Sequence, residues 1–288
     1  MIERFNFYDV YGYLIPGLTL VILLWLPVGI ITGKLPDDKA ASLAVVLVIA
    51  YIIGLHLHSM ATNAYPSRTM KGSDGNPQYP SVGLLDEKSE IGTDLKRRLQ
   101  KNVESWFGID IAAGKDANTL IAQRRQDAYN LCRPIVTAQK SYAEQFQGLY
   151  ALARGMSVSC ALAAPYYLGW AAWVWKRKDL GDAALVIIAA YAAIALCVAV
   201  AVALGKGDRL QNDQLGLFVV AILLLGSGYL VGSRFTVSSE TSEILIIGAI
   251  VLIAVSVRFF ALYKYFTVAH ARTLWSEFAS NSPERPRP

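Results

Sequence analysis

Two histidines, His56 and His58, have side chains of the type that most often binds metal ions, and they lie two positions apart. On a helix, side chains at that spacing point about 200° apart. Histidines that bind one metal ion together need a shared helix face, as the i, i+4 arrangement provides. We therefore interpret both as structural. His270 stands alone, so we expect no metal site.

Catalytic patterns are also missing from the sequence. The run Gly205-Lys206-Gly207-Asp208 lacks the third glycine of a dinucleotide-binding loop, and it follows no predicted strand. No GxSxG, HExxH or phosphate-loop sequence occurs. A membrane enzyme needs ionisable groups that converge within its bundle, and this chain offers few. We expect neither an enzyme nor a bound cofactor.

Arg258 is a charged residue near the end of a long apolar run. Charges inside membrane spans are costly, so they mark candidate functional residues. Its aliphatic stem could lie in the apolar region while its guanidinium group reaches the membrane surface. It could instead pair with a carboxylate such as Asp9, or line a polar path. Arg154 lies one turn from the same membrane surface and has the same alternatives. For Arg154 we favour a side chain that reaches the membrane surface.

A group of cations lies in the polar stretch of residues 63–148. They are Lys96, Arg97, Arg98, Lys101, Arg124 and Arg125. They could bind acidic lipid heads or a nucleotide-like signal ligand. The stretch holds 12 basic and 10 acidic residues and is therefore almost neutral, which favours a solvated helix face. No aromatic residues that could stack on bases alternate with these cations, so nucleic acid binding is not expected.

Long apolar segments decide the fold class. Hydrophobic residues make up 54% of the chain, and its mean hydropathy is +0.37. Runs of about 20 apolar residues match the thickness of a bilayer core. We expect an all-α, polytopic membrane protein of about six spans (four to six), with a helical cytosolic insert between spans two and three. The spans are residues 13–32, 42–61, 155–175, 183–204, 215–233 and 244–263.

This pattern predicts four parts: a membrane hairpin of antiparallel spans (1–62), the insert (63–148), a bundle of about four spans (149–266), and an interfacial helix with a disordered tail (267–288). In the insert, Thr93 or Asp94 can begin a helix that ends at Gly108. Asn118 can begin another, stopped by Pro134. Ser141 has the capping-box spacing and opens a helix without an obvious break into the third span.

Small residues recur at helix-packing spacing in two of the predicted spans. They are Ala189, Ala193, Cys197, Ala201 and Gly205 in the fourth span, and Gly228 and Gly232 in the fifth. Such residues let helix backbones approach closely. They could serve packing within one chain or contacts in a homo-oligomer. The three cysteines, Cys132, Cys160 and Cys197, form neither a disulfide framework nor a zinc pattern and are interpreted as small apolar fillers.

The positions of the basic residues favour one orientation. A cytoplasmic N-terminus and insert place most of them inside, as the positive-inside bias requires. The short run Lys176-Arg177-Lys178 contradicts this orientation, since it would lie outside. We find no cleavable leader pattern, so the first span is expected to remain as an anchor.

The opening segment Phe7–Gly17, FYDVYGYLIPG, resembles the start of membrane proteins encoded in bacterial anti-phage defence loci. The segment SYAEQFQGLYALARG, residues 141–155, has a similar likeness. The resemblance implies a protein of the bacterial inner membrane whose spans flank a cytosolic region and whose membrane part permeabilises or depolarises the host. Such proteins commonly have four spans, so six would be a departure.

These observations favour an effector that forms homo-oligomers and opens or disturbs the lipid bilayer when it is triggered through the insert. An alternative is a non-conducting anchor that recruits a separately encoded soluble partner. A third is a small-solute transporter, although the two halves of the chain do not match as transporter repeats do.

Overall fold

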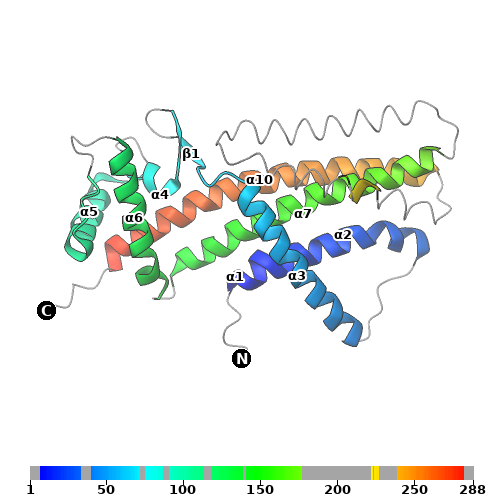
Figure 1. The fold of residues 1–288 in the computed structure, drawn as a ribbon, viewed down its shortest axis with the longest axis horizontal. Coiled ribbons are helices and arrows are strands. Elements are labelled where there is room, and N and C mark those ends of the chain that lie inside the picture. The colour runs from blue at the N-terminus through cyan, green and yellow to red at the C-terminus, as the bar shows by residue number, and fades with distance from the viewer. Residues whose placement is uncertain are drawn as a thin grey trace. The chain divides into compact units, whose positions relative to one another are not determined.

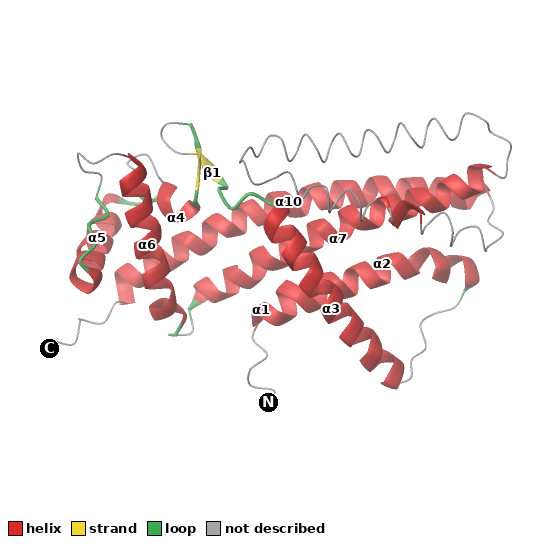
Figure 2. Cartoon of the chain, in the orientation of Figure 1, coloured by secondary structure: helices red, strands yellow, loops and turns green. Residues whose placement is uncertain are grey.

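A computed structural model of the chain describes residues 7–33, 40–71, 75–86, 91–112, 118–138, 141–176, 222, 224–226 and 239–281. Figures 1 and 2 show that this part of the chain is predominantly helical. The helical elements are α1 (Phe7–Asp9), η2 (Val10–Leu14), α2 (Ile15–Thr32), α3 (Ala40–Ala64), α4 (Pro80–Gly83), α5 (Thr93–Phe107), α6 (Asn118–Thr137), α7 (Tyr142–Lys176) and α10 (Ser239–Asn281). Two short antiparallel strands, β1 (Met70–Lys71) and β2 (Pro77–Gln78), pair Met70 with Gln78.

The chain divides into two compact units. Unit 1 contains Met1–Pro66 and Ala151–Ala261, and unit 2 contains Ser67–Tyr150 and Leu262–Pro288. The chain changes unit three times, and the second and third changes lie inside helices. Helix α7 passes from unit 2 to unit 1 after Tyr150, and α10 passes from unit 1 to unit 2 after Ala261. Two helices therefore contribute residues to both units.

Three helical segments in the described part are long and apolar enough to cross a membrane. They are Val10–Ile30, Ser42–Asn63 and Glu243–Ser280. Their outward side chains are apolar and exposed: Ile30 and Val48 are each 59% exposed, and Ile250 is 60% exposed. Soluble proteins rarely expose so much contiguous apolar surface, whereas helices in contact with lipid do. The chain thus has the helices of a membrane protein.

The six predicted spans have different outcomes. The first, second and sixth correspond to these three segments. The third lies within α7, which is helical there but is not among the segments apolar enough to cross by themselves. The fourth and fifth lie almost wholly outside the described residues. The predicted unbroken helix from Ser141 is confirmed, because α7 continues through Pro165 to Lys176.

Glycines allow α2 and α3 to pack backbone against backbone. A Cβ on Gly17 would lie 1.8 Å from the carbonyl oxygen of Ala50, and one on Gly54 would lie 1.9 Å from that of Tyr13. The partner numbers fall along α3 as they rise along α2, so the two helices are antiparallel. Their packing leaves no room for side chains at these two positions.

Pro16 explains the π-helical segment η2 before α2. Proline has no N–H, and its ring would clash with the carbonyl group four residues earlier. The wider π-turn avoids that clash, since the N–H of Ile15 bonds the carbonyl of Val10, five residues back. Pro16 itself is fully buried. A Cβ on Gly155 would lie 2.6 Å from its Cγ, so α7 also packs closely here.

Helix α7 supplies most of the buried core of unit 1. Its residues Val158, Leu162, Tyr166, Tyr167 and Trp170 pack against side chains of α2, α3 and α10. This explains why the third predicted span is less apolar than the others: other helices cover its tyrosines, tryptophan and serines. A helix enclosed by protein can carry polar groups that a helix in contact with lipid cannot.

Unit 2 has its own core. Leu99 and Val103 of α5 and Cys132 of α6 pack against Trp275 and Phe278 of α10, all almost completely buried. The predicted interfacial helix after residue 267 is thus part of α10, and its large apolar side chains lie within protein.

The predicted stop at Pro134 is wrong, because α6 continues to Thr137. The side chains on either side of the proline, Cys132 and Val136, are both buried in the core of unit 2. Their packing compensates for the proline, whose cost inside a helix is about 3 kcal/mol. The C-terminal end of α5 agrees with the prediction, and Gly108 closes it with a positive φ of 68°. At the other end the N-cap is Gly92, one position before Thr93, and no side chain caps the helix.

Replacing Gly17 by valine should lower the free energy of unfolding by about 3 kcal/mol or more, since the new side chain meets a backbone carbonyl that cannot move alone. The measurement is thermal unfolding of the purified protein in detergent. Gly12→Ala is the matched control, because a Cβ there would lie an ordinary 3.4 Å from Ala151 Cβ. Equal stability of the two variants would contradict the close packing of α2 on α3.

Candidate functional site

A histidine, an arginine and a tyrosine from three helical elements meet inside unit 1. Tyr8 belongs to α1, His58 to α3 and Arg154 to α7. Arg154 Nη2 lies 3.1 Å from His58 Nδ1, and Tyr8 Oη lies 3.2 Å from His58 Nε2. Arg154 is only 8% exposed. We call these three residues the arginine cluster.

Arg154 Nη2 lies near both imidazole nitrogens, 3.1 Å from Nδ1 and 3.2 Å from Nε2. Arginine only donates hydrogen bonds, so His58 accepts at one of the two. In the tautomer that accepts at Nδ1, the proton lies on Nε2 and can be donated to Tyr8 Oη. His58 therefore links an N-terminal aromatic residue to a buried cation. A phenylalanine or leucine at position 58 could make neither contact.

Two aromatic rings pack against the imidazole of His58. The ring of Tyr13 lies 4.9 Å from the imidazole, that of Tyr8 lies 5.7 Å from it, and all three rings meet edge to face. Each such contact stabilises the packing by about 1 kcal/mol, beyond what the burial of its apolar area contributes. The rings therefore fix the plane of the imidazole, and with it the direction of the bond to Arg154.

A second polar group, which we call the exit cluster, consists of Tyr65, Ser157 and Ser256. Tyr65 Oη lies 2.6 Å from Ser157 Oγ. Ser157 Oγ donates to the carbonyl of Ser256 at 2.7 Å, and Ser256 Oγ donates to the carbonyl of Ser157 at 2.8 Å. The two clusters are neighbours along the same helices. Arg154 and Ser157 are three positions apart and share one face of α7, and Tyr65 follows His58 by seven positions, about two helical turns.

The close packing of the helices brings these residues together. Gly54 lets α3 approach the segment that follows Tyr8, and Gly155, beside Arg154, lets α7 pack on Pro16. Ser159 Oγ donates to the carbonyl of Pro16 at 2.9 Å and fastens α7 to α2 at the same level. The polar residues thus lie where the first, second and third predicted spans begin or end.

This arrangement can hold charge and relay a change in hydrogen bonding. In the described part of the chain, no group of three or more His, Cys, Asp or Glu side chains could hold a metal ion. His56 lies away from the cluster, with Nδ1 2.9 Å from the carbonyl of Ile52.

The other predicted charged site residues lie elsewhere. Arg258 is exposed on α10. Asp9 is half-buried in α1. The predicted packing residues Ala189, Ala193, Cys197, Ala201, Gly205, Gly228 and Gly232 lie outside the described residues.

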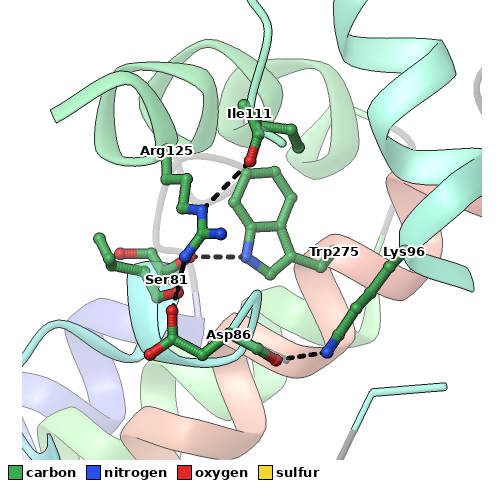
Figure 3. A network of polar contacts seen from close by, with 7 residues as sticks. Ser81, Asp86, Lys96, Ile111, Arg125 and Trp275 are labelled. Carbon is green, nitrogen blue, oxygen red and sulfur yellow. Dashed lines mark hydrogen bonds and ion pairs between the residues drawn. The ribbon is translucent and has the colours of Figure 1, made fainter. Parts of the chain in front are cut away.

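In unit 2, Arg125 is the centre of a buried polar network (Figure 3). Its Nη1 donates to Asp86 Oδ1 at 2.7 Å, and its Nε donates to the carbonyl of Ile111 at 3.2 Å. Trp275 Nε1 donates to the carbonyl of Ser81 at 3.0 Å, and Lys96 Nζ donates to the carbonyl of Asp86. The network joins α4, α5, α6 and α10, so it is structural.

The structure therefore divides the predicted cationic patch. Arg125 lies in the core at 4% exposed, and Lys96 is half-buried in its contact with Asp86. Arg124 lines a shallow pocket with Gly108, Ile109, Asp110 and Asp127. Arg97, Arg98 and Lys101 remain on the exposed face of α5, where Arg97 lies 3.9 Å from Asp94. Three exposed cations with a neighbouring acid form a weaker anion-binding surface than six would.

Sequence reasoning missed both clusters, because their members come from distant parts of the chain. His58 and Arg154 are 96 positions apart, and Ser157 and Ser256 are 99 apart. The sequence did contain a signal for the first cluster. His58 lies near the end of the second predicted span, and Arg154 lies just before the beginning of the third. Polar groups in an apolar environment need partners, so a contact between these two residues could have been predicted.

The chain was compared with models of protein families, with curated proteins and with solved structures. None of the three comparisons finds a match. What the chain does must therefore be argued from its own residues.

Replacing Arg125 by methionine should lower the free energy of unfolding by about 3 kcal/mol, since it leaves the mostly buried Asp86 carboxylate without its cation. Arg97→Met is the control, because its pair with Asp94 is exposed and should contribute less than about 0.5 kcal/mol. Thermal unfolding measured by tryptophan fluorescence distinguishes the two. Equal effects would show that Arg125 is not the structural centre of unit 2.

Burial raises the pKa of the Cys132 thiol to about 12. At pH 8 this thiol should therefore stay protonated and unreactive in the folded protein, because the thiolate is the reactive form. Alkylation with iodoacetamide, read by peptide mass spectrometry, should leave Cys132 unmodified until denaturant is added. Modification of the native protein at pH 8 would mean that α6 does not pack as described.

Proposed function

We propose that the chain is an effector of the bacterial inner membrane that forms homo-oligomers and permeabilises or depolarises the membrane when a signal reaches unit 2. In this proposal the protein has about six spans, and its N-terminus and insert face the cytoplasm. The arginine cluster is the observation that carries the proposal. The likeness of the segment Phe7–Gly17 to membrane proteins of anti-phage defence suggests phage infection as the setting.

A buried cation is an expensive feature for a membrane anchor. An anchor needs only apolar helices of sufficient length, and α2 and α3 already provide them. Arg154 instead places a permanent positive charge within the helices of unit 1, tied to the imidazole of His58. Ionisable groups at such positions line or control polar paths in many membrane proteins. The cluster therefore favours an activity of the membrane helices themselves.

The helices shared by the two units also support an effector. An effector needs a part that receives a signal and a part that acts on the membrane. Unit 2 has its own core around Trp275 and Leu99, so it can change state as a unit. Helices α7 and α10 each continue from unit 2 into unit 1 without a loop.

The alternative is a non-conducting anchor that recruits a soluble partner. Its support is the folded unit 2, which exposes Arg97, Arg98 and Lys101 on α5 and has a separate pocket lined by Asp110 and Asp127. In that case a soluble protein should copurify with the chain while membranes that contain it keep their potential.

The test is membrane potential, followed with a voltage-sensitive dye, in bacteria that express the chain before and after phage infection. Arg154→Met should abolish depolarisation at an unchanged membrane level, because the buried charge and its bond to His58 are lost. Tyr8→Phe removes only one hydroxyl and should weaken the response. Arg258→Met is the matched control, since that arginine is exposed, and should behave like the unaltered protein.

One result would contradict the proposed function, and another would contradict the role of the arginine cluster in it. If the unaltered chain is present in the membrane and the potential stays intact before and after infection, the effector function is excluded and the anchor remains. If Arg154→Met depolarises as strongly as Arg258→Met, the effector function stands, but the arginine cluster has no part in it.

A further inference from the structure

The chain passes between unit 1 and unit 2 three times: after Pro66, after Tyr150 and after Ala261. Each passage has one member of the exit cluster close to it on the unit 1 side. Tyr65 directly precedes the first passage, Ser157 lies two turns beyond the second, and Ser256 lies shortly before the third. All three residues belong to unit 1.

Each hydroxyl of the exit cluster donates one hydrogen bond. Ser157 gives its proton to the carbonyl of Ser256, so the proton between Tyr65 and Ser157 comes from Tyr65. Ser256 gives its proton back to the carbonyl of Ser157. The ring of Phe260 packs on that of Tyr65 with 5.0 Å between centroids. The three passages are thus joined by one set of bonds.

The bonds between α7 and α10 are reciprocal, which makes them all-or-none. A shift of α7 along α10 moves Ser157 away from the carbonyl of Ser256, and it moves Ser256 away from the carbonyl of Ser157 at the same time. Ser157 is completely buried, so its hydroxyl would find no water after such a shift. An unpaired buried hydroxyl is costly. The contact therefore has two distinct states, formed and broken.

We propose that the exit cluster is the contact through which a change in unit 2 reaches the membrane helices of unit 1. Breaking these bonds would release the membrane activity, a consequence that rests on the proposed function. Coupling between two parts of a protein needs an element with two discrete states that both parts can bias. The reciprocal serine bonds are such an element, and they lie on the two helices that belong to both units.

Ser159 provides a matched control on the same helix. It is also completely buried, and its Oγ also donates to a carbonyl of another helix, that of Pro16. Its partner lies on α2, however, and α2 belongs to unit 1 alone. Removing the hydroxyl of Ser159 should therefore disturb packing without breaking a bond between α7 and α10, the two helices that continue into unit 2.

The test is hydrogen exchange of the purified full chain in detergent, followed in α5 and α6, which lie wholly in unit 2. In the double variant Ser157→Ala, Ser256→Ala, the amides of these two helices should change their exchange rate by about fivefold or more, the lower range of known coupling between sites. Ser159→Ala should leave them within about twofold, since that serine takes no part in the coupling.

Unchanged exchange in α5 and α6 of the double variant would overturn the inference. An equal change in Ser159→Ala would also overturn it, because the effect would then be general destabilisation. Dye measurements in cells separate this inference from the proposed function. We expect the double variant to depolarise bacteria without infection. If even the unaltered chain is silent after infection, the proposed function fails, while the exchange experiment still decides whether the exit cluster couples the units.

Discussion

The close approach of three helices at the segment Tyr13–Gly17 is the constraint on which unit 1 depends. Pro16 forces the wide π-turn of η2 before it, and Gly17 and Gly54 allow α2 and α3 to touch through their backbones. Helix α7 packs on the same segment through Gly155. These contacts leave only one place for the side chains at the ends of the helices, so Tyr8, His58 and Arg154 meet. A larger residue at either α2–α3 glycine would separate α2 from α3.

Unit 1 has a mixed interior and an exterior with many apolar side chains. Helices α2, α3 and α10 expose isoleucine, leucine and valine, whereas α7 carries buried serines, tyrosines and a tryptophan beside apolar core residues. Apolar exteriors suit a bilayer, where polar groups need partners within the protein. The third predicted span, which lies in α7, is therefore less apolar than the first, second and sixth because other helices cover it. Its serines fasten it to two neighbours, Ser159 to α2 and Ser157 to α10.

Local signals predicted local structure well, because such structure depends on neighbouring residues. Gly108 ends α5, and Ser141 begins α7, with its Oγ accepting a hydrogen bond from the N–H of Ala143. The prediction failed where distant packing overrules a local preference, as at Pro134, which stays inside α6. It also gave Arg125 a surface role, since nothing near position 125 indicates that Asp86 and the carbonyl of Ile111 surround it. The site residues His58 and Arg154 were each noticed, but their contact depends on how three helices pack.

The two buried arginines show why charge alone does not mark a functional residue. Arg125 has a carboxylate partner and two backbone carbonyls within reach, so its charge is balanced and its guanidinium fixed. Replacing Arg125 should therefore mainly destabilise the fold of unit 2. Arg154 lies among the membrane helices and bonds the imidazole of His58, a group that can act as donor or acceptor. Its contacts can therefore change when the helices move. The membrane helices of unit 1, rather than the polar network of unit 2, are therefore where an activity of this protein is best sought.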